Sequence, residues 1–291
     1  MDWSHIKANE RKPDERDILL GSVVAPVSTP ASYVPDISWL VRNFQGQLPM
    51  CGEHAATHFK AILDYVASNG ATVERKNPRY GSIKLKDPKS PVCDGYAENA
   101  GTDMRAIFKW LQKAGADDFE PLENDVTLPI ATYCDPSAVT PAMDADAATS
   151  MIANYAFGNT DFASLCQYIY ASKAVLLLIK CDEGFWGTAT PTFTTPTYGH
   201  FIVAFGYDAD GIYIIDSADP NDAFAIKHIH AQYITNVFII ESGTAIDLPP
   251  SAQSVLTNPT IPPATKPQLI QQIVSDIAQA LSLVKQELGQ L

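Results

Sequence analysis

The 291-residue chain lacks the residue spacings that mark common metal and nucleotide sites. Its five cysteines include no Cys-x-x-Cys pair, so nothing supports a zinc site. Neither GxGxxG nor GxxxxGK[ST] occurs, so no nucleotide site is indicated. Asp216, Asp219 and Asp222 do not have the Asp-x-Asp-x-Asp-Gly spacing of a calcium loop. We therefore expect no metal and no cofactor.

Positive charge and long apolar runs are also scarce. The sequence contains 20 Lys and Arg residues but 33 Asp and Glu residues, which gives a net charge of -13. We therefore expect no nucleic-acid partner. No run reaches the roughly 18 apolar residues of a membrane helix, and the N-terminus lacks the apolar stretch of a secretory signal. We therefore expect no membrane partner and a cytoplasmic-type or virion-associated location with reduced thiols.

A loop that leads into a helix carries the first candidate for chemistry, Cys51. Gly46 and Pro49 break regular structure before it, and apolar residues then recur at helical spacing. A thiol at a helix N-terminus lies at the positive end of the helix dipole, which favours the nucleophilic thiolate. Gln45 lies six residues upstream, where its amide can donate to an oxyanion beside the sulfur.

A cysteine by itself is most often a small buried hydrophobe, so Cys51 needs a partner base. His200 opens an apolar run that ends at Tyr207, and a second run covers Gly211–Asp216. The four residues Asp208–Gly211 between the runs have the composition of a hairpin turn. The hairpin would return Asp216 to the side of His200, where a carboxylate can fix the imidazole tautomer and stabilise its cation.

The order Gln45, Cys51, His200, Asp216 resembles that of the papain-like cysteine peptidases, over residues of about 35–241. In that family a glutamine, a cysteine, a histidine and an asparagine or aspartate follow one another, with the same spacings before the cysteine and after the histidine. The resemblance implies an α+β fold with a helical left domain and an antiparallel, β-barrel-like right domain. It also implies a thiol endopeptidase that cleaves peptide or protein substrates.

In that family the four residues have defined roles, which the resemblance carries to this chain. Cys51 would be the nucleophile, His200 the general base and acid, and Asp216 the residue that orients the imidazole. Gln45 would donate to the oxyanion. The same chemistry also serves other acyl transfers, such as amide ligation or deamidation.

Two departures from papain leave an alternative open. Gly52 follows the cysteine where papain has Trp, and Ala218 ends a triplet that is Asn-Ser-Trp in papain. The missing Trp would have shielded the contact between histidine and carboxylate. The Cys-Gly and Gly-His-Phe sequences also resemble peptidases that process bacteriocin leader peptides, but a predicted helix near 101–120 and the chain length favour the papain branch. The alternative function is that of a weak or inactive papain-fold protein in assembly.

Domain organisation follows from composition. We expect four segments: an N-terminal arm at 1–35, a papain-like domain at 36–246, a Pro-rich linker at 247–267 and a helix at 268–291. The helical part of the domain would cover about 36–125, and its β part about 161–242. Apolar residues of 268–291 alternate four and three apart, which predicts a coiled-coil seam for a homo-oligomer or for docking on a partner.

Within the domain, Thr72–Asn99 reads as loop because of its prolines and glycines. Helices are expected at Cys51–Ser68, Thr102–Ala114 and Ala142–Ala156 and from Phe162 onward. Strands are expected at Val175–Lys180, His200–Tyr207, Gly211–Asp216, Ala223–His228 and Asn236–Glu241.

Two further features allow two interpretations each. His54 and His58 lie four apart on the first helix, as metal ligands can, but no further ligands fit, which favours a structural pair. Trp186 lies in an aromatic loop just before His200, where it would either wall a substrate cleft or pin the loop to the core.

Overall fold

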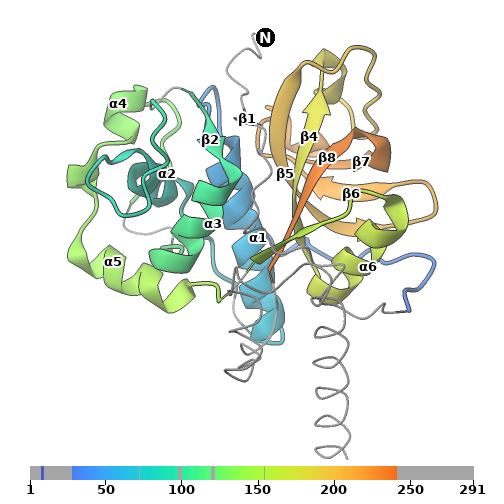
Figure 1. Cartoon of the computed structure of the whole chain (residues 1–291), viewed down its shortest axis with the longest axis horizontal. Coiled ribbons are helices and arrows are strands. Elements are labelled where there is room, and N and C mark those ends of the chain that lie inside the picture. The colour runs from blue at the N-terminus through green and yellow to red at the C-terminus, as the bar shows by residue number, and fades with distance from the viewer. Residues whose placement is uncertain are drawn as a thin grey trace, which may run out of the picture. The chain divides into compact units, whose positions relative to one another are not determined.

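A computed structural model describes residues 8–9, 28–71, 73–97, 100–118, 122–153 and 155–240. Figure 1 shows a group of helices on one side and a sheet with one covering helix on the other. These residues belong to one unit, residues 1–242. The predicted linker and the predicted C-terminal helix lie outside the described residues. No helix among the described residues has the length and apolarity to cross a membrane.

In the helical part, the described residues form five α-helices. They are α1 Cys51–Ala67, α2 Pro78–Lys86, α3 Met104–Lys113, α4 Ile130–Tyr133 and α5 Pro141–Ala147. The Asn77 side chain caps α2 by accepting from two backbone N–H groups, and Asp103 caps α3. These caps place the helix starts where polar side chains satisfy backbone donors.

Helix α2 corrects the prediction of a loop at Thr72–Asn99. Pro78 is the first residue of the helix, where a missing N–H removes no helical hydrogen bond. Gly81 is needed inside the helix because a Cβ there would lie 2.3 Å from the ring of Trp110. Of the residues that indicated a loop, Pro78 therefore begins the helix, and Gly81 allows α2 to pack closely against α3.

The β part is a six-stranded antiparallel sheet in the order β3-β8-β4-β5-β6-β7. Its strands are β3 Tyr155–Gly158, β4 Val175–Cys181, β5 Tyr198–Tyr207, β6 Ile212–Ile215, β7 Ile226–Ile229 and β8 Ile234–Ile240. The helix that follows β3 is α6, Phe162–Ser172. The predicted helix Ala142–Ala156 was wrong in its second half, because the chain there turns into the edge strand β3.

Short strands also join the N-terminal arm to the body. Residues Ala8–Asn9 form β1, which pairs in parallel with β2, Thr102–Asp103. Tyr33 exchanges backbone hydrogen bonds with Tyr207 at the end of β5. The predicted start of the second helix at Thr102 is therefore two residues early.

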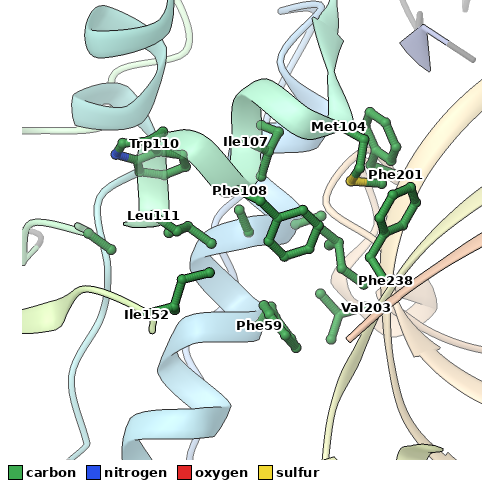
Figure 2. Packing of buried hydrophobic residues seen from close by; sticks show 14 of the residues in the cluster. Phe59, Met104, Ile107, Phe108, Trp110, Leu111, Ile152, Phe201, Val203 and Phe238 are labelled. Atoms are coloured by element: carbon green, nitrogen blue, oxygen red, sulfur yellow. The ribbon is translucent and has the colours of Figure 1, made fainter. Parts of the chain in front are cut away.

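One hydrophobic core lies between the helices and the sheet. Figure 2 shows Phe59 of α1 and Phe108 of α3 beside Phe201 and Phe238 of the sheet, all fully buried. Alternate residues of β4 and β5 point instead to a second core under α6. Because α1 packs against β5 in the first core, the N-terminus of α1 meets the start of β5. This packing brings Cys51 and His200 to one place.

Candidate active site

Cys51 is the first residue of α1, and only 1% of its surface is exposed. Met50 precedes it and supplies no side-chain cap to the helix. The backbone N–H groups of the first turn point toward this end of the helix, where they favour a negative charge. Gly52 follows because α1 is packed tightly at this point: a Cβ would lie 3.1 Å from side-chain atoms of Ile107 and Phe201. The Trp that papain has at this position would not fit.

His200 and Asp216 meet across the β5–β6 hairpin. His200 Nε2 lies 2.8 Å from Asp216 Oδ1, and both side chains are completely buried. The register explains the contact, because Val203 pairs with Ile215 and Asp216 is the first residue after β6. Backbone N–H groups of Ala218 and Asp219 donate to the Asp216 carboxylate at 2.8 and 3.1 Å. They fix the carboxylate toward the ring.

The surroundings of His200 favour the imidazolium. Burial alone would lower its pKa, but hydrogen bonds with Asp216 and with Cys51 outweigh burial and raise the pKa to about 9. Burial likewise tends to raise the pKa of Asp216, but its hydrogen bond to His200 holds that pKa below the usual value. Because Asp216 occupies Nε2, Nδ1 is the ring nitrogen that remains for the Cys51 thiol. His200 can therefore carry a proton at neutral pH beside the Cys51 side chain.

Gln45 is held beside this pair through Ser217. Its Oε1 accepts from the Ser217 hydroxyl at 2.7 Å, and its backbone N–H donates to the Ser217 carbonyl at 2.9 Å. Its Nε2 donates to the Leu48 carbonyl at 3.0 Å, which uses one of the two amide hydrogens. Ser217 was not among the site residues predicted from the sequence. Its position directly after Asp216 was the signal that it would reach the same site.

Phe185 and Trp186 cover the imidazole of His200. Their ring centroids lie 5.4 and 6.4 Å from that of His200, and both side chains are largely buried. Both residues come from the loop between β4 and β5. Because the Trp186 side chain is largely buried, it anchors this loop to the core rather than forming the wall of an open cleft. The two rings also shield the histidine, as the Trp missing after Ser217 would have done.

The helical histidine pair is part of the framework. His58 Nε2 accepts from the Asn43 N–H at 2.7 Å, and His54 Nδ1 lies 2.8 Å from the Met50 carbonyl. Burial lowers the pKa of His54 to about 4 and that of His58 to about 3, so both are neutral at pH 7. They tie the loop before Cys51 to α1. In the described parts of the chain, no three His, Cys, Asp or Glu side chains converge as metal ligands do.

Solved structures share this arrangement of elements. Xylellain, a cysteine protease from Xylella fastidiosa, is 14% identical, with a TM-score of 0.67 over 83% of this chain and 97% of that chain. The cysteine protease and lectin-like domains of Cwp84 from Clostridium difficile are 12% identical, with a TM-score of 0.59 over 74% of this chain and 52% of that chain.

A Carica candamarcensis cysteine protease, CMS1MS2, solved in complex with E-64, is 14% identical, with a TM-score of 0.51 over 72% of this chain and 98% of that chain. No protein-family model and no curated protein sequence matches the chain. At these identities the likeness concerns the fold. The chain has the papain-like fold, which confirms the fold class predicted from the sequence.

Proposed function

We propose that the protein is a thiol endopeptidase that hydrolyses peptide bonds through Cys51, His200 and Asp216, with Gln45 as an oxyanion donor. One observation carries the proposal. A buried imidazole lies 2.8 Å from a carboxylate through Nε2, and the Cys51 thiol at the start of α1 acts together with that carboxylate to raise the imidazole pKa to about 9. The papain-like fold of solved cysteine proteases supports the same chemistry.

The residues would act in sequence. His200 takes the thiol proton, and the Cys51 sulfur attacks the peptide carbonyl carbon. The Gln45 side chain and the Cys51 backbone N–H donate to the oxyanion that forms. His200 then gives its proton to the leaving amine, and water hydrolyses the thioester. Asp216 keeps the ring oriented throughout. The substrates are peptides or proteins.

Peptide hydrolysis by matched variants tests the proposal. Cys51→Ala should abolish hydrolysis because it removes the nucleophile. Gln45→Ala should lower kcat by about 10²–10³-fold, the effect of losing one oxyanion donor. Cys166→Ala is the control, because Cys166 is a buried thiol of α6 whose pKa burial raises to about 11. Hydrolysis that survives Cys51→Ala would refute the assignment. Labelling by E-64, the compound bound to the Carica protease, supplies a second readout.

Burial of the site favours one alternative, a weak or inactive papain-fold protein that binds or assembles. Gln45, Cys51 and His200 are each at most 1% exposed, so a substrate can reach them only if the residues that cover them move. The predicted heptad helix at 268–291 would then carry the function, in a homo-oligomer or on a partner. The molecular mass in solution, measured for the chain with and without residues 248–291, tests whether this helix causes self-association. If both are monomers at micromolar concentration, self-association is wrong.

A further inference from the structure

A buried lysine lies behind the pair of His200 and Asp216. Lys227 belongs to β7 opposite Ile214 of β6, and its side chain is completely buried. Its Nζ lies 2.8 Å from Asp219 Oδ2 and donates to the Thr188 carbonyl at 3.1 Å. A buried ammonium is expensive to desolvate unless it is paired, so its presence here indicates a specific role.

The third neighbour of this ammonium is Asp216. Lys227 Nζ lies 3.7 Å from Asp216 Oδ2, the oxygen that does not contact His200. The same oxygen accepts the backbone N–H of Asp219, and the Asp219 carboxylate accepts the N–H of Gly187. The lysine therefore links the loop that carries Asp216 and Asp219 to the aromatic loop that covers His200. It also packs over the ring of Phe185 at 4.8 Å.

Charge gives this link a further consequence. Where papain has a neutral Asn, this chain has Asp216, and Asp219 adds a second buried carboxylate. Lys227 balances one of the two, so one negative charge remains to stabilise the imidazolium. Without the lysine, two unbalanced carboxylates would act on the ring.

Other ionisable groups lie around the same cluster from α1, β4 and the neighbouring loops. Arg42 donates to the carbonyls of Ser217 and Asp219 and forms an ion pair with the exposed Asp222. Its charge is therefore paired at the surface side of the loop rather than with Asp216. The remaining groups are Cys51, His58, Cys181 and Asp182. Burial keeps His58 neutral and raises the pKa of Cys181 well above its usual value. Apart from His200 itself, Lys227 is therefore the buried cation, among the described residues, that lies next to Asp216.

We propose that Lys227 is a positioning residue of this site, whose ammonium holds Asp216 and Asp219 in place and limits how strongly their charge acts on His200. The role rests on the proposed peptidase function. Its electrostatic part can nevertheless be measured on His200 directly, without hydrolysis.

Titration of His200 by NMR in the full chain, with labelled histidine and His200→Gln for assignment, tests the proposal. Lys227→Met keeps the length and apolar packing of the side chain but removes the charge. The midpoint should rise by about one pH unit, a tenfold change in proton affinity. Asp219→Asn removes the competing carboxylate, so the ammonium acts more on Asp216 and the midpoint should fall. Lys86→Met is the control, because Lys86 makes an equally buried ion pair with Asp94 in the helical part.

Opposite shifts in Lys227→Met and Asp219→Asn, with no shift in Lys86→Met, would support the proposal. Unchanged midpoints, or shifts of the same sign, would overturn it. If Lys227→Met does not fold, Lys227→Gln, which also removes the charge but keeps a polar end that can donate to Asp219, decides by whether the His200 midpoint rises. Failure of the peptidase proposal looks different, because the wild-type chain would then not hydrolyse peptides while the titration shifts persisted.

Discussion

The charge of Asp216 can be removed without changing the shape of the site. Asp216→Asn retains an oxygen that can accept from His200 Nε2, now 2.8 Å from Asp216 Oδ1, but removes the negative charge. His200 has a pKa of about 9 against an ordinary value of 6.5, a difference equivalent to about 3 kcal/mol in favour of the imidazolium. An opposite charge at this range accounts for about one to three pH units. The pKa of His200 should therefore fall to about 6–8 in the variant.

The alkaline limb of kcat/KM reports this change, because it follows loss of the His200 proton in the free enzyme. We expect the limb near pH 9 in the wild-type chain and about one to three units lower in Asp216→Asn. Asp222→Asn is the matched control, since Asp222 lies on the same loop but its side chain is 91% exposed and pairs with Arg42. A limb that stays near pH 9 in Asp216→Asn, or that moves equally in the control, would refute the reasoning.

Three further predictions follow from the geometry. Ser217→Ala removes the hydroxyl that holds Gln45 Oε1 at 2.7 Å. We expect kcat to fall by about tenfold, which is less than the effect of losing the Gln45 amide, with little change in KM. An unchanged kcat would contradict this role of Ser217. The folded-state pKa of His200 lies above its unfolded value, so its contribution to stability is complete below pH 6.5 and is lost as the pH rises through 9. Between pH 6.5 and 9, the free energy of unfolding measured in urea should fall by about 3 kcal/mol in the wild-type chain and by much less in Asp216→Asn. Equal losses in both chains would argue against this role of Asp216. Gly52→Trp should destabilise the fold by more than about 3 kcal/mol because Ile107 and Phe201 fill the space, and a melting temperature equal to that of the wild-type chain would show that reasoning to be wrong.

The sequence predicted the parts of the fold that depend on local pattern. The apolar period after Cys51 predicted α1 to within one residue of its end, and the turn at Asp208–Gly211 predicted the hairpin that brings His200 to Asp216. Helix α2 was missed because Pro78 and Gly81 act through tertiary context. Such context is absent from a local pattern.

The supporting residues of the site were harder to predict for a similar reason. Lys227 falls in a predicted strand, and nothing in a strand pattern distinguishes a lysine that faces solvent from one that is completely buried. Trp186 allowed two interpretations until its distance from His200 was known. Burial and partner identity depend on which distant loops meet, here the loops at 184–197 and 216–222.

Alkylation of the five thiols by iodoacetamide at pH 6, followed by mass spectrometry of each modified cysteine, tests the central claim most directly. If His200 and the start of α1 stabilise a thiolate, Cys51 will react fastest although it is only 1% exposed, and faster than the more exposed Cys93. Rates that follow exposure alone, with Cys93 ahead of Cys51, would contradict the account.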